Sequence, residues 1–302
     1  MLNDNQIKSF YDNGFIHIKN FFSKDFINSL RKYLLDKYID EKSNYHASGS
    51  DLLSDELLSK IILDDKLISS IQSILGKKIV YFGESCWNCS SGKTTPMAYH
   101  TDNSDRNSHG KDWEIENYPI VRFAFYLQDH VNQGGGPLIG LQTHKKFIQN
   151  MYLRVLYRET VGPLTGKFIH VPCEIGDLLI WNLRTTHAGD GLKFKHINFP
   201  ISKRLSKFIP EFLISRCKEK RFLINGNFGL ESDELTKYIT YLKTRSYQIE
   251  RWNNMNISEK KLIELNSKGV KFLNFQDEIK IKIKNGKINL NQLHKDHVDY
   301  KV

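Results

Sequence analysis

The feature that most constrains the fold is a succession of short segments rich in β-branched and aromatic residues between residues 78 and 229. Clusters of Gly, Asn and Asp separate these segments, which is typical of strands joined by turns. Many short strands without interleaved helices favour a sandwich or jelly-roll barrel over a parallel α/β sheet. We therefore predict a mainly β fold with flanking helices, and the strands are KIVYFGESCW, PIVRFAFYLQD, PLIGLQ, KFIHVPCEI, GDLLIWNL and KRFLINGNFGL.

Residues 1–76, before the β-rich region, show helical periodicity instead. A first helix is expected to end at Gly14, because glycine readily adopts the left-handed conformation that closes a helix. Ser23 can cap a second helix, and a third helical stretch closes at Gly76. These helices predict a layer that packs against the strands.

The carboxyl-terminal part has a different character. Ser232 can cap a further helix, and residues 251–302 are rich in Lys and Asn. Within them, IKIKIKNGKINL predicts a hairpin that turns at Asn285 and Gly286. We expect one domain over residues 1–250, with the jelly-roll core at 78–229, and a basic extension over 251–302. MYLRVLYRE, beginning at Met151, fits either a helix or a strand.

Composition and charge restrict the cellular context and the partners. No apolar run approaches the roughly 20 residues of a membrane helix, and the amino terminus lacks a secretory pattern, so we expect a cytoplasmic protein without a membrane span. The four cysteines are too few for a disulfide framework, and we interpret the CxxC of Cys86 and Cys89 as strand packing. The net charge of +10 favours an anionic partner. Since no nucleic-acid-binding signature accompanies it, we expect a small, anionic or carrier-linked molecule and no nucleic acid.

The string Tyr99-His100-Thr101-Asp102 carries the first chemical signal. On an extended strand, residues two apart point to the same face, so His100 and Asp102 converge. Iron(II) in many oxygenases is bound by two histidines and one carboxylate, which leaves positions open for oxygen and a cosubstrate. An HxD pair alone occurs often by chance, so the hypothesis requires a second histidine elsewhere in the chain.

His187 is the candidate for that second histidine. It ends GDLLIWNLRTTHAGDG, where a predicted strand meets a glycine-rich loop. The interval between His100 and His187 leaves room for several strands, which a jelly roll could use to bring the two positions together. We therefore predict that His100, Asp102 and His187 are both the catalytic centre and the metal ligands.

The chain resembles the phytanoyl-CoA dioxygenase family through most of its first 245 residues. The likeness lies in NDNQIKSFYDNGFIHIKNFFSKDFINSLR, in YHTD, in GGGPLIGLQTHKK and in GDLLIWNLRTTHAG, which occur in the family's order. This resemblance implies a double-stranded β-helix, a cupin-like jelly roll, that holds Fe(II) and uses 2-oxoglutarate and O2. It also implies release of succinate and CO2 with hydroxylation of an unactivated carbon. Oxidative cyclisation, desaturation and epimerisation use the same ligands and stay open, as does a catalytically silent binding module. Asp102 argues against halogenation.

The resemblance further implies an arginine, on a strand after the distal histidine, that pairs with the far carboxylate of 2-oxoglutarate. A guanidinium suits this role because its fork matches a carboxylate. The candidates are Arg204, Arg216 and Arg221. Arg204 is nearest to the family's usual interval but lies in a stretch that we interpret as loop, so we select Arg221, which opens a strand. Arg122 is a further candidate for cofactor binding, because its strand could line the barrel.

With Arg221 in that role, residues 189–219 become an insertion between the last two barrel strands. Its basic residues would lie near the mouth of the site, where they could select the substrate. A solvated loop without a specific role is the alternative. The residues in question are Lys193, Lys195, His196, Lys203, Arg204 and Lys207.

Overall fold

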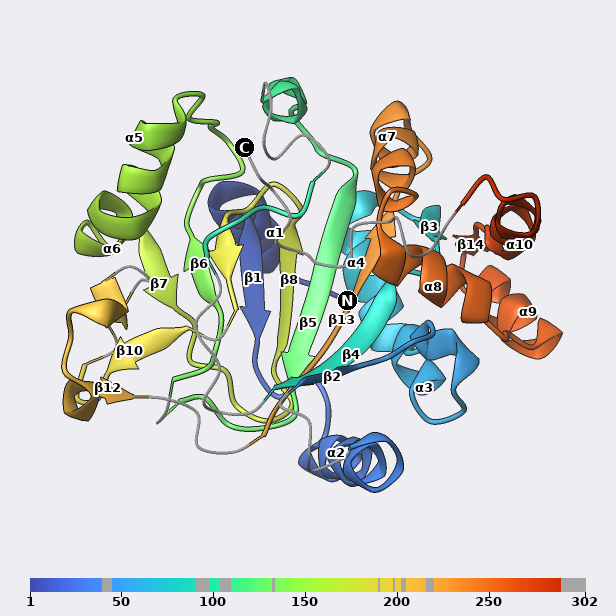
Figure 1. The fold of residues 1–302 in the computed structure, drawn as a ribbon, viewed down its shortest axis with the longest axis horizontal. Coiled ribbons are helices and arrows are strands. Elements are labelled where there is room, and N and C mark those ends of the chain that lie inside the picture. Colours follow the sequence, from blue (N-terminus) through green and yellow to red (C-terminus); the bar gives the residue numbers. More distant parts are fainter. Residues whose placement is uncertain are drawn as a thin grey trace.

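Two mainly antiparallel sheets form the centre of the molecule (Figure 1). The computed structural model describes residues 1–39, 45–90, 98–103, 110–131, 134–189, 191–197, 199–201, 205–215 and 220–288. Within these ranges the larger sheet has the order β1-β8-β5-β13-β3-β14, with β4 also on β13 and β2 on β4. All its pairs are antiparallel except β3 with β14. The strands are β1 (Phe15–Ile18), β2 (Tyr45–Ala47), β3 (Ile79–Tyr81), β4 (Ser85–Ser90), β5 (Ile120–Tyr126), β8 (Leu178–Asn182), β13 (Arg221–Gly229) and β14 (Val270–Phe272).

The smaller sheet faces the inner side of the larger one. It consists of β7 (Phe168–His170), β6 (Leu138–Gly140) and β9 (His187–Ala188) in that order. Ile139 and Val171 of this side form an apolar cluster with Ala124, Tyr126 and Trp181 of the larger sheet. The prediction of a mainly β fold with flanking helices is confirmed in this form.

Successive side chains of β5 face opposite sides of the larger sheet. Val121, Phe123 and Phe125 belong to the cluster beneath the amino-terminal helices, whereas Ala124 and Tyr126 face the smaller sheet. Because successive side chains of a strand point to opposite faces, Arg122 shares the inner face with Ala124.

The predicted amino-terminal layer contains helices but also contributes strands. β1 follows Gly14, which has a φ of +86°, and pairs with β8 at the edge of the larger sheet. Its four residues lie between two helices, so periodicity alone missed the strand. The helices are α1 (Asp4–Asn13), α2 (Lys24–Tyr38), α3 (Ser59–Ile62) and α4 (Asp65–Leu75), and the expected caps Ser23 and Gly76 bound α2 and α4.

The carboxyl-terminal helices cover the side of the larger sheet that carries β3 and β14 (Figure 1). Trp252, Met255 and Ile279 are buried in one cluster with Phe82 and Tyr238. Among the described residues, no helix has the length and apolar character of a bilayer-crossing segment. The helices are α7 (Asp233–Leu242), α8 (Ser246–Asn254), α9 (Glu259–Ser267) and α10 (Gln276–Lys284).

The hairpin predicted at Asn285 and Gly286 is wrong, because this segment forms α10. The alternating Ile and Lys residues suggested a strand, but Ile279 and Ile283 also lie one helical turn apart, and both pack against the cluster around Trp252. Gly286, with a φ of +65°, ends the helix: its amide donates to Ile283 and the next amide donates to Lys282.

Residues between β9 and β13 form a small sheet instead of the expected loop. Its strands are β10 (Leu192–Phe194), β11 (Pro200–Ile201) and β12 (Ile214–Ser215), in the order β11-β10-β12. Leu192, Ile201 and Ile214 are buried together as its own core. MYLRVLYRE, which fitted either a helix or a strand, is helical. It lies in α5 (Met151–Leu156) and in a following π-helical turn (Tyr157–Val161) that leads into α6 (Gly162–Leu164).

Asp177, in the Gly-Asp turn before β8, ties that strand to β1. One carboxylate oxygen accepts the amide of Asn20 at 2.9 Å, and the other contacts His17 Nε2 at 2.7 Å and the amide of Glu174 at 2.9 Å. Burial opposes ionisation of Asp177, but the bonds from His17 and the amides outweigh it and lower the pKa from its ordinary value of 3.8. The stability contributed by this carboxylate is therefore present above pH 4 and is lost as the pH falls through its lowered pKa.

We expect Asp177→Asn to lower the free energy of unfolding by about 1–3 kcal/mol at neutral pH, because a buried charged acceptor is replaced. Urea unfolding of the variant and the parent protein at several pH values measures this. The difference between the two should shrink as the pH falls below about 4. A difference that does not change with pH would show that the charge of Asp177 contributes nothing.

Candidate metal centre

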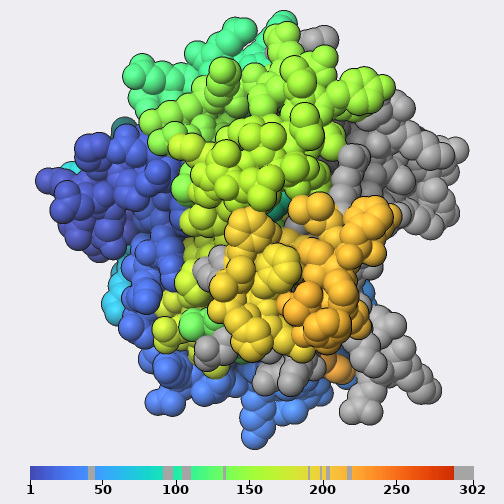
Figure 2. Space-filling view, turned by 90° about the vertical axis from the view of Figure 1, so that its left-hand side faces the viewer, coloured from blue at the N-terminus to red at the C-terminus, as the bar shows by residue number. Residues whose placement is uncertain are grey.

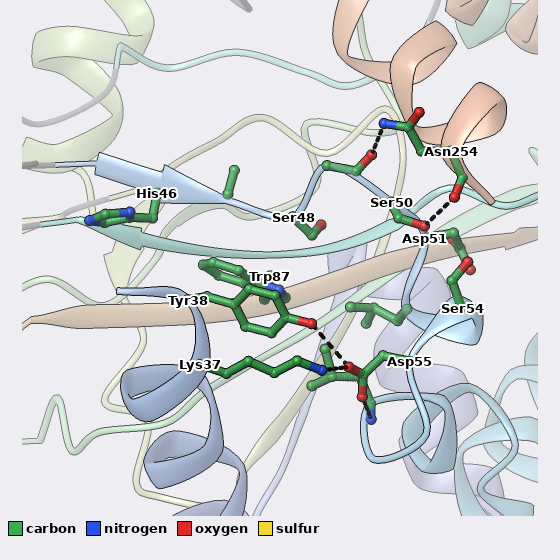
Figure 3. Close-up of a pocket in the computed structure, with 14 residues that line it drawn as sticks. Lys37, Tyr38, His46, Ser48, Ser50, Asp51, Ser54, Asp55, Trp87 and Asn254 are labelled. Atoms are coloured by element: carbon green, nitrogen blue, oxygen red, sulfur yellow. Dashed lines mark hydrogen bonds and ion pairs between the residues drawn. The ribbon is translucent and has the colours of Figure 1, made fainter. Parts of the chain in front are cut away.

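A cavity of about 510 Å³ on the outer side of β4 contains none of the predicted ligands (Figure 3). Tyr38 and Trp87 line it with ring centroids 5.3 Å apart, and the hydroxyl of Tyr38 donates to Asp55 at 3.1 Å. Trp87 packs in the cluster beneath the amino-terminal helices, so this cavity lies across the larger sheet from its inner face. The predicted metal ligands lie on the inner face instead.

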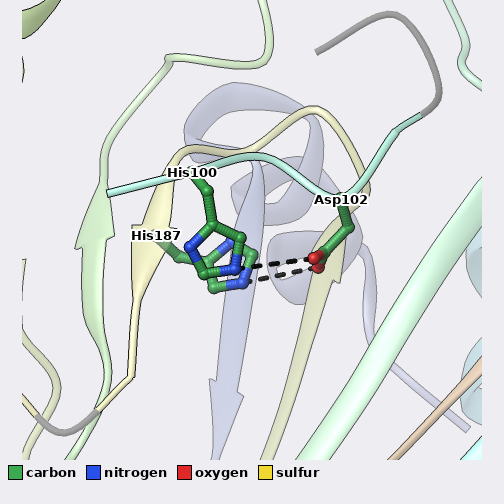
Figure 4. A group of neighbouring side chains, drawn as sticks. All are labelled: His100, Asp102 and His187. Carbon is green, nitrogen blue, oxygen red and sulfur yellow. Dashed lines mark ion pairs between the residues drawn. The ribbon is translucent and has the colours of Figure 1, made fainter. Parts of the chain in front are cut away.

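His100, Asp102 and His187 lie together there, as the sequence predicted (Figure 4). Each offers one ligand atom, and these atoms lie within 4.8 Å of one another. His100 Nε2 is 3.7 Å from Asp102 Oδ1, and His187 Nε2 is 3.4 Å from Asp102 Oδ2. Two imidazole nitrogens and a carboxylate at this spacing form a donor set that a divalent metal ion could occupy.

Backbone pairing holds the two histidines side by side. The amide of His100 donates to His187 O at 2.9 Å, and the amide of His187 donates to His100 O at 2.8 Å. The amide of Asp102 donates to Leu183 O at 3.0 Å, which fixes the carboxylate opposite the rings. The backbone hydrogen bonds therefore bring the three predicted ligands to one point.

The second nitrogen of each ring fixes its protonation pattern. His100 Nδ1 contacts the carbonyl of Ala98 at 2.9 Å, and His187 Nδ1 contacts the carbonyl of Thr185 at 3.0 Å. Because a carbonyl can only accept, each Nδ1 carries a proton, and Nε2 is the ring nitrogen that faces Asp102 and is placed to bind a metal ion. This is the arrangement that metal-binding histidines commonly adopt.

Arg122 joins this centre to a second buried carboxylate. Its Nη1 lies 3.2 Å from Asp102 Oδ2, and its Nη2 donates to Glu84 Oε1 at 2.9 Å. Its Nε donates to the side-chain oxygen of Asn227 at 2.7 Å. These three contacts commit the guanidinium to the protein, so Arg122 supports Asp102 and is poorly placed to clamp a ligand carboxylate.

Glu84 is in turn held by neighbouring side chains. Asn227 donates to Glu84 Oε2 at 2.5 Å, and the hydroxyl of Tyr238 donates to Glu84 Oε1 at 3.0 Å. Burial raises the pKa of Glu84, against the attraction of Arg122. For Arg122, burial opposes the charge, but Asp102 and Glu84 outweigh it and raise its pKa. The network therefore connects α7 to the metal-ligand candidates.

Trp181 adds a buried donor beside the histidines. Its ring centroid lies 5.2 Å from that of His187, and the residue is 7% exposed. Its Nε1 has no hydrogen-bond partner within the described residues. An indole N–H left in this position fits a site that receives an oxygen-bearing ligand, since buried donors are normally satisfied.

Of the three arginines proposed to pair with 2-oxoglutarate, the structure describes Arg221. Arg221 is buried at the start of β13, where Nε donates to Gly135 O at 2.6 Å and Nη2 donates to the hydroxyl of Tyr126 at 3.2 Å. Its register places Arg221 on the same inner face of β13 as Asn227. The two residues are six positions apart, which corresponds to roughly 20 Å of extended strand. Arg204 and Arg216 lie outside the described residues.

The basic residues expected at the mouth of the site differ in their exposure to solvent. Lys193 is 6% exposed and its ammonium donates to Val131 O at 2.6 Å, so it holds the insertion in place and is not available at the surface. Lys195, His196 and Lys207 are exposed. Lys203 lies outside the described residues.

Sequence reasoning missed Glu84, Asn227, Tyr238 and Trp181 as parts of the site. Asn227 pairs with Arg122 across β13 and β5. Trp181 pairs with Arg122 from the other neighbour, β8. The register of the sheet, which the sequence does not state, is what unites them.

No protein-family model matches the sequence, and no curated protein matches it. Several solved structures are nevertheless similar. HygX from Streptomyces hygroscopicus with nickel and 2-oxoglutarate bound gives a TM-score of 0.55 at 17% identity, over 76% of this chain and 88% of that chain. HygX has also been crystallised with nickel, 2-oxoglutarate and hygromycin B, and with iron.

Two further structures show the same likeness. SnoK, a non-heme alpha ketoglutarate dependent carbocyclase from nogalamycin biosynthesis, gives 0.51 at 15% identity over 76% of this chain and 84% of that chain. EctD from S. alaskensis in its apoform gives 0.51 at 13% identity over 76% and 77%. At these identities the likeness shows that the chain shares the fold of these proteins.

Proposed function

We propose that this protein is an Fe(II)- and 2-oxoglutarate-dependent oxygenase that hydroxylates an unactivated carbon of a small metabolite and releases succinate and CO2. The observation that carries the proposal is the convergence of His100, Asp102 and His187, with Nε2 of both histidines facing the carboxylate. Two histidines and one carboxylate with open positions are typical of non-haem iron oxygenases. HygX, whose fold the chain shares, binds 2-oxoglutarate, which supports the choice of cosubstrate.

We further propose that the two sheets are the halves of a double-stranded β-helix. The orders β8-β5-β13-β4 and β7-β6-β9, with His100 bridged to β9, support this interpretation. In this proposal residues 1–250 are the oxygenase domain, 189–219 are an insertion before its last strand, and 251–302 extend it.

The chain's own residues would have separate tasks in the reaction. His100, Asp102 and His187 would hold the iron, which supplies oxygen activation together with bound 2-oxoglutarate. Arg122 would hold the Asp102 carboxylate in orientation, and Glu84 and Asn227 would hold Arg122. Trp181 would donate its N–H to a ligand oxygen beside His187. The apolar inner cluster would exclude water from the reacting atoms.

We propose Arg221 as the partner of the far carboxylate of 2-oxoglutarate. It is a buried cation on the inner face of β13, and it donates to the carbonyl of Gly135 and to the hydroxyl of Tyr126. Arg221→Gln should raise the dissociation constant for 2-oxoglutarate by about 10- to 100-fold, because a charge-assisted bond contributes about 1.5–3 kcal/mol. Calorimetric titration with 2-oxoglutarate in the presence of Ni(II) measures this.

Arg204→Gln is the matched control, because Arg204 is the rival from the sequence. It should bind 2-oxoglutarate like the parent protein, and both variants should bind Ni(II) unchanged. If Arg204→Gln weakens 2-oxoglutarate binding and Arg221→Gln does not, the assignment is reversed.

The substrate would be anionic or carrier-linked, since the chain carries a net charge of +10. The same ligands could also support cyclisation, desaturation or epimerisation, and SnoK, a carbocyclase, shares the fold. The experiment that tests the class is succinate formation from 2-oxoglutarate by iron-reconstituted protein, with and without O2. Turnover that requires both iron and O2 supports an oxygenase. Absence of both 2-oxoglutarate binding and turnover would leave only a silent binding module.

A further inference from the structure

The helical segment of residues 151–164 presents its apolar side chains to solvent. Tyr152 is 80% exposed, Leu156 51% and Leu164 69%. Its inner side carries charged groups beside Tyr157, whose ring packs against Phe168: Glu159 is buried, and Arg158 contacts the carbonyl of Tyr99 at 3.5 Å. An ordinary surface helix turns its apolar stripe toward the core, so this amount of exposed apolar surface is unusual.

The insertion also presents apolar side chains to solvent. Phe208 is 84% exposed, Phe212 69% and Ile197 60%. The core of the insertion is already complete with Leu192, Ile201 and Ile214, so these further apolar side chains are not needed for packing.

Both segments lie on one face of the molecule. β11 of the insertion lies against β7, and α6 also packs against β7. Figure 2 shows this face, with the segment that contains α5 and α6 in light green directly above the insertion in yellow and orange. We call the exposed apolar side chains of these two segments the apolar face: Met151, Tyr152, Leu153, Leu156, Val161, Leu164, Ile197, Phe208, Phe212 and Leu213. Exposed apolar groups gathered in this way mark interaction sites.

Cations accompany the apolar face. Lys146 and Lys167 flank the helical segment and are exposed, and Lys195 and Lys207 are exposed on the insertion. Against these, the described part of the insertion exposes one acid, Glu211. A second copy of the chain, docked through the same face, would bring these lysines against one another, which is unfavourable.

We propose that the apolar face docks onto an anionic lipid surface. Aromatic and leucine side chains beside lysines are the composition of surfaces that lie in a membrane interface, where apolar burial and attraction to anionic headgroups act together. The protein binds the surface without crossing it. This inference is independent of the oxygenase chemistry and brings the insertion, next to β9 and its His187, to the lipid.

Cosedimentation with vesicles tests the proposal. The full chain should bind vesicles that mix phosphatidylcholine with phosphatidylglycerol, and should bind vesicles of phosphatidylcholine alone more weakly. Phe208→Ser with Phe212→Ser should lower the partition coefficient by about tenfold or more, because two exposed rings lose their apolar contact. Lys195→Glu with Lys207→Glu should lower it by more than about tenfold.

The matched control is Ile263→Ser with Ile281→Ser. These residues are 63% and 58% exposed on α9 and α10, on the other side of the molecule (Figure 1), and the control should bind like the parent chain. Failure to sediment with either vesicle would overturn the proposal. So would full binding by the phenylalanine variant, which would reduce the effect to charge attraction. A vesicle-free dimer that the same variant dissociates would assign the face to a second copy.

Discussion

His187→Ala is expected to abolish Fe(II)-dependent turnover of 2-oxoglutarate and to weaken Fe(II) binding by more than about 100-fold. Loss of groups that merely orient a ligand already costs 10- to 100-fold in affinity, and here a ligand itself is removed. His187 is partly buried, and its backbone pairs with that of His100 whatever side chain it carries, so the fold should survive. Anaerobic calorimetry with Fe(II) and circular dichroism measure the two effects.

His46→Ala is the control for this variant. His46 lies on β2 beside the outer cavity and should contribute nothing to the metal centre (Figure 3). If His187→Ala retains iron-dependent activity while it stays folded, another residue is the distal ligand and the assignment fails.

Arg122→Gln is expected to lower the free energy of unfolding of the metal-free protein by about 3–5 kcal/mol. The change leaves two buried carboxylates, Asp102 and Glu84, without the cation between them, and removal of one partner of a buried ion pair typically costs this much. Urea unfolding of chelator-treated protein measures the effect.

A double-mutant cycle separates the ion pair from a general packing defect. Glu84→Gln combined with Arg122→Gln replaces the pair with two neutral amides of similar shape, so the double variant should lose less than the sum of the single losses. Tyr238→Phe removes the hydrogen bond that the hydroxyl donates to Glu84 and the one that it accepts from Asn227, and should cost about 1–3 kcal/mol. Additive losses from Glu84 and Arg122 would contradict the coupled network.

The strands of the core were predictable from the sequence because each reads as a short apolar run bounded by turn residues. The segments that we predicted as strands contain β3, β5 to β8 and β13, and the first half of β4. Where two periods fit equally, local pattern failed: Ile279 and Ile283 match a strand and a helix, and the tertiary contact with Trp252 decides.

The metal centre was predictable in part for the same reason. His100 and Asp102 lie two residues apart, so their convergence follows from local geometry. His187 required the order of the segments around it. The network behind Asp102 could not be predicted, because Glu84, Arg122 and Asn227 meet only through the register of three strands.

The most direct test of the proposed centre is anaerobic addition of Fe(II), and then 2-oxoglutarate, to the metal-free protein, followed by visible absorption spectroscopy. Chelation of iron by 2-oxoglutarate gives a visible charge-transfer band. We predict that the band saturates at one iron per chain and is absent from His187→Ala. A folded parent protein that binds Fe(II) but develops no band with saturating 2-oxoglutarate would contradict the proposal.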